Sequence, residues 1–303
     1  MKKLQRTLTL PTAIAISIGG MLSGIFVLPG IAVGITGSSI WLAFLVAALC
    51  VLPAVLSKSE LATAMPKSGG TYVYIERAFG PLFGTVSGLG LWLSLLLKSA
   101  FSLVGLSAYL YVIVQIDAGL SKIVALVSLG FILILNVFGV KKVGNTQLVI
   151  VSGSIVSLII IIFFGISSFD SKLLDPVFLD GNYGFISAVA FLYISYAGVT
   201  KVAAVAGEIK TPEKNLPRSM LISLFLITSV YILIGLVLVG NVPSNQLVSD
   251  IRPIYTLSSA IGGEVFGYIA GFVGVMTLLS MANSGVLASS RFPFAMARDK
   301  MLP

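Results

Sequence analysis

Histidine is absent from the 303-residue chain, and cysteine occurs once, as Cys50. These absences exclude an intrachain disulfide, a zinc site built from the usual histidine and cysteine ligands, and a histidine proton relay. Charged residues are scarce too, at 10% of the chain, whereas a soluble domain has about 25%. Because 57% of the residues are hydrophobic, most of the chain is suited to lipid rather than to water.

Eight apolar stretches are long enough to cross a hydrocarbon core of about 30 Å, which needs roughly 20 helical residues. They cover residues 10–35, 39–63, 83–115, 122–140, 144–168, 183–207, 217–240 and 263–290. The first stretch is too long for a cleaved signal peptide, and it lacks a small-residue cleavage site before polar sequence. The sequence therefore predicts an all-α integral membrane protein with about eight transmembrane helices in one domain, 1–303.

Lysine and arginine concentrate in the loops of one side. That side, which includes the N-terminus, carries Lys2, Lys3, Arg6, Lys58, Lys67, Arg77, Lys141, Lys142, Lys210, Lys214, Arg218, Arg291, Arg298 and Lys300. The loops of the other side carry Lys122, Lys172 and Arg252. The positive-inside rule then predicts a multi-pass protein of the cell membrane with a cytoplasmic N-terminus. This distribution accounts for the net charge of +8 as a topology signal, so we expect no nucleic-acid partner.

Small residues interrupt the first and the sixth stretches at corresponding places. The interruptions read Gly19-Gly20-Met21-Leu22-Ser23-Gly24 and Ser195-Tyr196-Ala197-Gly198-Val199-Thr200. Glycine costs about 1 kcal/mol inside a helix, and backbone groups freed at membrane depth must line a cavity or bind something. Helices five spans apart enter the membrane from opposite faces. The pair is therefore typical of the inverted five-plus-five repeat of secondary transporters, with 1–168 as the first repeat and 183–303 as an incomplete second.

Four stretches carry a family likeness. They are Ser23-Gly24-Ile25-Phe26 with Pro29 and Gly30; Glu60-Leu61-Ala62 through Pro66-Lys67-Ser68-Gly69-Gly70-Thr71-Tyr72 to Arg77-Ala78-Phe79-Gly80; Tyr196-Ala197-Gly198 with Glu208-Ile209-Lys210-Thr211-Pro212-Glu213-Lys214-Asn215-Leu216-Pro217; and Ser290-Arg291 with Ala295-Met296-Ala297-Arg298-Asp299. In this order they resemble the amino acid permeases of the amino acid–polyamine–organocation superfamily. The resemblance implies a leucine-transporter-like fold with broken helices 1 and 6.

The chain departs from that family in two ways. Leu22 stands where the family usually has the first glycine of a Gly-Ser-Gly motif. The predicted spans also stop at eight, so the second repeat lacks its fourth and fifth helices. We therefore predict a truncated permease, with the missing C-terminal helices supplied by the same gene or by a partner. A natural truncation is the alternative.

The resemblance implies that the two breaks bind the backbone of an amino acid substrate. The residues expected to do so are Gly20, Ser23, Gly24, Phe191, Tyr196, Ala197, Gly198 and Thr200. Half-helix N-termini suit a carboxylate, which we assign to the first break, while carbonyls near Ile16 and Ala197 face the amino group. Alternatively the glycines only allow close helix packing, and the two aromatic residues are packing residues rather than a gate.

Two lysines within the spans are candidates for ion coupling. Lys98 lies near the middle of the third stretch, where a cation is costly unless it is paired or neutralised. It could titrate, replace a sodium ion, or bind helix carbonyls and trapped water. Lys201 follows the second break and could reach a vestibule, pair with Glu208 or sit near substrate; a solvated position is equally open. A cation there disfavours positively charged substrates.

A sodium site is a further possibility. Ser280, Asn283 and Ser284 in the eighth stretch offer oxygen ligands suited to a hard cation, although membrane serines more often bond back to helix carbonyls.

The favoured function is secondary active import of neutral amino acids by alternating access, coupled to protons. The alternatives are a non-transporting permease fragment or subunit and a carrier of polyamines or other organocations. The spans hold no histidine, cysteine pair or carboxylate pair, so we expect no catalytic residue and no enzyme activity. The glycine runs also lack the ending of a phosphate-binding loop, and the sequence predicts no cofactor or metal.

Overall fold

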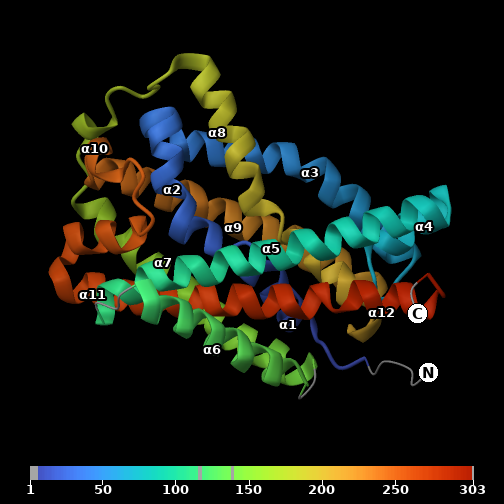
Figure 1. The fold of residues 1–303 in the computed structure, drawn as a ribbon. Coiled ribbons are helices and arrows are strands. Elements are labelled where there is room, and N and C mark those ends of the chain that lie inside the picture. The colour runs from blue at the N-terminus through green and yellow to red at the C-terminus, as the bar shows by residue number, and fades with distance from the viewer. Residues whose placement is uncertain (1–5, 115–117, 138–139, 302–303) are drawn as a thin grey trace.

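Long helices laid side by side make up the computed structural model, which describes residues 6–114, 118–137 and 140–301 (Figure 1). The α-helices are α1 (Leu10–Gly19), α2 (Ser23–Thr36), α3 (Ile40–Ala64), α4 (Thr71–Phe79), α5 (Pro81–Val114), α6 (Ala118–Val137), α7 (Val140–Ser167), α8 (Gly181–Tyr196), α9 (Pro212–Asn241), α10 (Ser244–Leu247), α11 (Pro253–Ser289) and α12 (Arg291–Arg298). Three 3-10 segments join them: η1 (Gly37–Ser39), η2 (Ser171–Leu174) and η3 (Val199–Glu208).

Each predicted span corresponds to a helix or to a pair of helices, so the all-α membrane fold is confirmed. Six stretches of the described residues are long and apolar enough to cross a membrane. The first of them, Leu10–Ala64, contains two of the predicted spans, which meet at η1. The fourth predicted span is a shorter apolar helix, Lys122–Val137. The number of crossings and the repeat boundaries therefore stay predictions.

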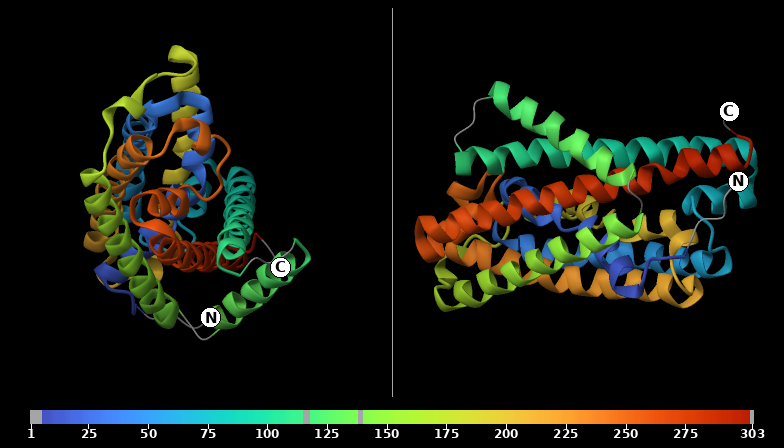
Figure 2. Two further views of the ribbon diagram at one scale, coloured as in Figure 1. Left: turned by 90° about the vertical axis from the view of Figure 1, so that its left-hand side faces the viewer. Right: turned by 90° about the horizontal axis from the view of Figure 1, so that it is seen from below.

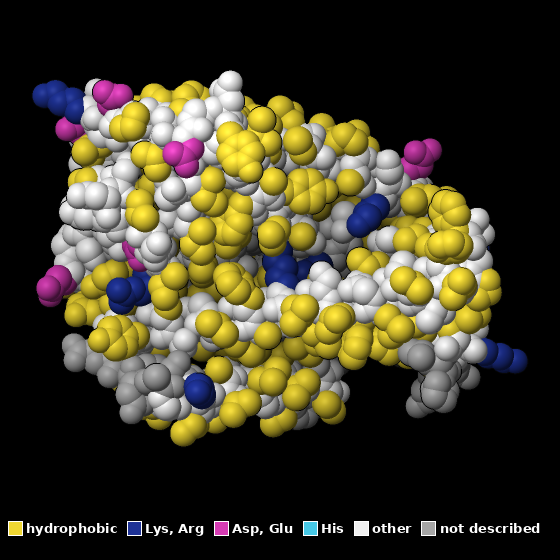
Figure 3. Space-filling view, turned by 45° about the horizontal axis from the view of Figure 1, so that its top comes forward, with side chains coloured by type: hydrophobic (Ala, Val, Ile, Leu, Met, Phe, Trp, Pro, Cys, Tyr) yellow, Lys and Arg dark blue, Asp and Glu magenta, His cyan; other side chains and the backbone are white. Residues whose placement is uncertain are grey.

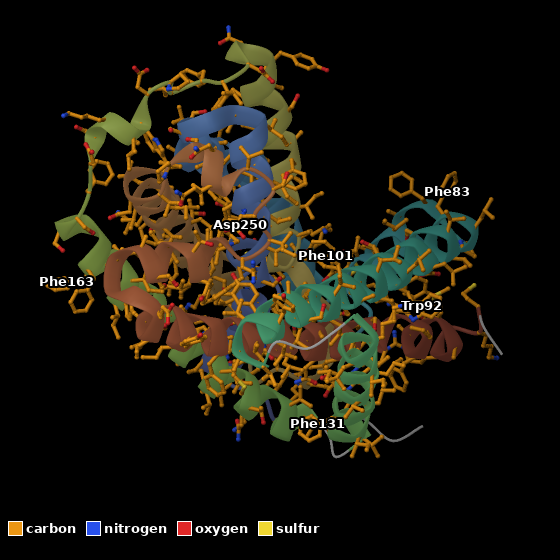
Figure 4. The ribbon with its side chains drawn as sticks, turned by 60° about the vertical axis from the view of Figure 1, so that its left-hand side comes forward. Phe83, Trp92, Phe101, Phe131, Phe163 and Asp250 are labelled. Atoms are coloured by element: carbon orange, nitrogen blue, oxygen red, sulfur yellow. The ribbon has the colours of Figure 1, made fainter. Side chains whose placement is uncertain are left out.

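Apolar side chains cover the outside of the bundle as well as its core. Phe163 on α7 is 74% exposed, and Phe83 and Phe131 also point outward (Figure 4). Lipid can solvate these side chains, whereas the backbone must satisfy its hydrogen bonds within each helix. This requirement explains why nearly every apolar stretch forms a helix. Charged side chains in the interior are exceptions to this apolar pattern, because a charge is costly inside a membrane.

The two ends of the bundle differ. α4 and α12 lie at one end, together with the first residues that the structure describes, whereas α10 lies at the other (Figure 1). The loops predicted to be cytoplasmic therefore share one end wherever the structure describes them. α5 and α11 run side by side along the length of the bundle, and α6 lies on its outside (Figure 2).

A backbone bridge and an ion pair, together called the clasp, join three segments at the end of the bundle that holds α4 and α12. The backbone of Leu8 pairs with Ile209 in a parallel bridge, and the Lys210 N–H donates to the Leu8 carbonyl at 2.8 Å. Glu208, at the end of η3, forms an ion pair with Arg291 of α12 at 2.8 Å. Three segments far apart in sequence are thereby held at one point. Nearby on α4, burial raises the pKa of Tyr74 to about 12, so this phenol stays neutral.

Contact between α5 and α11 depends on a glycine. A Cβ atom at Gly274 would lie 2.6 Å from the ring of Tyr109, so only glycine fits at this point of α11. The Tyr109 hydroxyl in turn donates to the carbonyl of Phe26 at 2.6 Å. Close approach of these helices therefore positions α5 against α2, the second half of the first interrupted span.

We predict that Gly274→Ala destabilises the protein, because the added methyl group has no room beside Tyr109. Overpacking of this kind costs about 1–3 kcal/mol. Gly90→Ala on α5 is the matched control, since no heavy atom lies within 4 Å of its Cβ position. Thermal unfolding of both purified variants in detergent tests the prediction. An equal or higher melting temperature for Gly274→Ala than for Gly90→Ala would contradict it.

Candidate functional site

The first predicted break is confirmed. α1 ends at Gly19 and α2 begins at Ser23, so a short turn separates two helical segments. In this turn the N–H groups of Met21 and Leu22 both donate to the carbonyl of Ile18 at 2.8 Å. The turn is buried, and the Ser23 hydroxyl at its end makes no hydrogen bond within the described part of the chain. The break thus leaves a donor and acceptor free at the N-terminus of α2.

The second predicted break is also confirmed. α8 ends at Tyr196, and the chain continues from Val199 as the 3-10 segment η3 instead of an α-helix. A 3-10 helix of more than about four residues is uncommon, and such stretches often mark functional hinges. Backbone angles at Val205 depart from helical values within η3. The sixth predicted span is therefore half α-helix and half a tighter, less regular coil.

The two breaks touch each other through their backbones. A Cβ atom at Gly198 would lie 2.1 Å from the carbonyl carbon of Gly20, so neither position has room for a side chain facing the other. The Ser17 hydroxyl reaches across and donates to the Val199 carbonyl at 3.1 Å. Gly24 packs against Ser195, whose buried hydroxyl has no partner among the described residues. Close packing and a pair of helix breaks therefore coexist at one place.

Aromatic side chains support this contact from α3, α8 and α9. The buried Tyr231 hydroxyl donates to the carbonyl of Met21 in the first break. The ring of Tyr231 lies 5.3 Å from that of Tyr196, centroid to centroid, and 4.7 Å from that of Phe44. The Tyr196 hydroxyl donates to the Phe44 carbonyl at 3.0 Å. This hydroxyl is therefore held by α3 in the present structure rather than free to meet a substrate.

A pocket of about 220 Å³ lies beside the second break. Of the predicted site residues, Tyr196, Ala197, Thr200 and Lys201 line it. Gly20, Ser23, Gly24 and Gly198 do not, because the breaks press against each other. Phe191 is partly buried against the core and also stays outside the pocket. Of the eight predicted substrate residues, the structure therefore places three, Tyr196, Ala197 and Thr200, in this cavity and two, Gly20 and Gly198, in the backbone contact. Their role in binding stays a prediction.

The two predicted coupling lysines occupy different surroundings. Lys98 Nζ donates to the carbonyl of Ile194 at 3.0 Å, in the last turn of α8, where the helix dipole favours a cation. Lys201 is only 3% exposed, and its Nζ lies 3.5 Å from the sulfur of Met281. The suggested pairing of Lys201 with Glu208 is wrong, because Glu208 pairs with Arg291. In the space-filling view, lysine or arginine atoms lie recessed among hydrophobic ones (Figure 3).

The predicted sodium ligands on α11 face another helix. The Asn283 Oδ1 accepts from Asn136 of α6 at 2.8 Å, and the Ser284 hydroxyl bonds back to the Met281 carbonyl at 3.0 Å. Ser280 and Asn283 line a pocket shared with α6 and α7. A sodium site there stays a prediction. The described residues contain no group of three or more histidine, cysteine or acidic side chains that could hold a metal ion.

Four residues at or beside the site were not predicted from the sequence: Lys58, Gln147, Ser195 and Tyr231. Gln147 is buried against Gly19, and neither atom of its amide has a partner among the described residues. Lys58 Nζ donates to the Thr200 hydroxyl at 3.3 Å. A polar side chain within an apolar span was the available signal for Gln147. Lys58 was assigned to a loop because it lies close to the end of its span.

Comparison with known proteins identifies the family. The sequence model of the amino acid permease family matches residues 12–303. The chain belongs to the amino acid permease family. The functional class is therefore a transporter rather than an enzyme, and this permease is a multi-pass membrane protein.

Three relatives show what this permease is similar to. It is 28% identical to the serine/threonine exchanger SteT of Bacillus subtilis over 99% of its own length and 70% of the relative's. It is 26% identical to the branched-chain amino acid permease BcaP of Bacillus subtilis, over 100% of its own length and 69% of the relative's. The BcaP of Lactococcus lactis is also 26% identical, over 100% of this chain and 70% of the relative's length. The chain thus spans about 70% of the length of these relatives.

We predict that Tyr231→Phe destabilises this permease modestly. The Met21 carbonyl keeps the bond it accepts from the Gly24 N–H at 2.8 Å, so the loss is one net hydrogen bond, about 0.5–1.5 kcal/mol. Tyr183→Phe is the control, because Tyr183 is 84% exposed. Chemical unfolding in detergent measures the difference. Equal stability of the two variants would show that the Tyr231 hydroxyl does not hold the break.

Proposed function

We propose that this permease imports neutral amino acids by alternating access and that import is coupled to protons. The observation that carries the proposal is the contact of two interrupted spans at Gly20 and Gly198, in a chain that belongs to the amino acid permease family. SteT and BcaP support the substrate class, because their names specify serine and threonine or branched-chain amino acids, all of which are neutral.

The half-helices offer complementary ends to an amino acid. α2 begins at Ser23, and its N-terminus supplies N–H groups and a free hydroxyl for a carboxylate. α8 ends at Tyr196, and its C-terminus supplies carbonyl groups for an ammonium group. In the present structure the breaks are in contact, so entry of a substrate requires them to separate. Lys201 beside the break disfavours a polyamine or an amino acid with a cationic side chain.

The proposed setting is the cell membrane, with the N-terminus in the cytoplasm. The distribution of lysine and arginine along the sequence supports it. The grouping of α4 and α12 at one end of the bundle supports it too (Figure 1). This end carries the clasp between Glu208 and Arg291. Opening of the clasp would then release substrate towards the cytoplasm.

Uptake into proteoliposomes tests the transport proposal. We expect the purified chain to accumulate labelled L-serine or L-leucine and to leave spermidine outside. Gly198→Ala is expected to reduce uptake, because its methyl group overlaps the Gly20 backbone and displaces the two breaks from each other. Gly153→Ala on α7 is the control, since no heavy atom lies within 4 Å of its Cβ position. Equal uptake by protein-free liposomes and by the wild type would refute transport by this chain.

We assign proton coupling to Lys98, which interacts electrostatically with Lys201. We predict that the dependence of uptake on pH is lost in Lys98→Met, because this variant has no ammonium group to titrate at Ile194. Lys122→Met is the control, since Lys122 lies exposed on α6. The measurement is initial uptake over a series of external pH values. A pH profile that is the same in Lys98→Met and the wild type would remove Lys98 from the coupling mechanism.

A further inference from the structure

The pocket beside the second break has walls from five parts of the chain. α3 contributes Lys58 and the apolar turn before it, α4 contributes Thr71, α5 contributes Ser94, and the second break contributes Thr200 and Lys201. Phe292 of α12 lies at the end of the bundle that carries the clasp. Gly20, Ser23 and Gly24 do not line this pocket, although Gly20 lies against the side chain of Lys201. The pocket therefore adjoins the first break, where the carboxylate of a substrate is proposed to bind.

The lysines of the pocket have no carboxylate beside them within the described residues. None of the described residues that line it is acidic. In the described ranges the ion pairs closer than 4.0 Å are Arg291–Glu208 and Arg298–Asp299. Lys58, Lys98 and Lys201 therefore have no carboxylate partner there, and Lys98 and Lys201 act on each other as like charges. A buried charge without a partner costs several kcal/mol, which a bound anion would offset.

The ammonium groups of Lys58 and Lys201 each have one weak hydrogen-bond acceptor. Lys201 is 3% exposed and has a thioether sulfur as its acceptor, which is a poor partner for an ammonium group. Lys58 donates to the Thr200 hydroxyl at 3.3 Å, which leaves its remaining N–H groups free for another acceptor. The Thr200 hydroxyl can donate in the same direction. The wall of the pocket thus presents one buried cation, one reachable cation and hydroxyl donors.

We propose that this pocket is a carboxylate-binding vestibule, in which Lys58 and Thr200 hydrogen-bond the anion and Lys201 adds a second positive charge from behind. The carboxylate has two possible sources, a free small carboxylate or the α-carboxylate of a transported amino acid. The second source rests on the proposed function. In that case the vestibule is a second site for the substrate, between the clasp and the breaks.

Thermal stability of the purified full chain tests the site without requiring transport. Sodium formate, replacing sodium chloride at constant ionic strength, is expected to raise the melting temperature, because a ligand that binds the folded state stabilises it. Lys58→Gln is expected to need about tenfold more formate, or greater, for the same shift, since a hydrogen bond to a charged group is lost. Lys58→Arg should restore the response. Lys214→Gln, an exposed lysine on α9, is the matched control.

L-serine and L-serinamide distinguish the two sources of the carboxylate. Stabilisation by L-serine but not by L-serinamide, lost in Lys58→Gln, would show that the vestibule binds the substrate's carboxylate. Stabilisation by formate alone would support a site for free carboxylates. Two outcomes would overturn the site: no stabilisation by formate or by L-serine, or equal formate dependence in the wild type and Lys58→Gln. If uptake is absent but the formate response depends on Lys58, the proposed function fails and the site stands.

Discussion

Contact between two glycine backbones, at Gly20 and Gly198, is the constraint on which the rest of the structure depends. A helix can be interrupted inside a membrane only where its freed backbone groups find other partners. Here the Ser17 hydroxyl of α1 donates to the Val199 carbonyl of η3. The Tyr231 hydroxyl of α9 donates to the Met21 carbonyl in the first break. The aromatic residues of α3, α8 and α9 then pack around the contact. Neighbouring helices therefore stabilise a pair of breaks that neither span could maintain alone.

Unpaired positive charge is the second feature of the interior. Each of three lysines meets a neutral acceptor: Lys58 the Thr200 hydroxyl, Lys98 a carbonyl of α8, and Lys201 a sulfur of α11. In a medium of low dielectric constant such charges act over longer distances than they do in water. In the proposed vestibule these lysines disfavour a cationic substrate and favour an anionic group. An amino acid bound there would turn its carboxylate towards Lys58 and Lys201 before it reaches the breaks.

The clasp at the end of the bundle links the site to the chain ends. Glu208 closes η3 and pairs with Arg291, which directly precedes Phe292 in the wall of the pocket. The bridge between Leu8 and Ile209 joins the chain before α1 to the same point. A movement of η3 would therefore displace α12 and the chain before α1, to which it is bonded. This arrangement gives a physical route by which occupation of the pocket could be coupled to opening of the breaks.

Composition and glycine spacing were sufficient to predict the helices and the two breaks, because membrane burial and backbone freedom are local properties of a sequence. The family was predicted from its resemblance to four motifs along the chain. They were not sufficient for the site. Only the tertiary structure shows that Gly20 touches Gly198, that Asn283 faces α6 instead of the breaks, and that Glu208 pairs with Arg291 rather than Lys201. Lys58 became part of the site for the same reason. A residue's partner depends on which faces of distant helices meet, and helical periodicity in an all-apolar span carries little information about that.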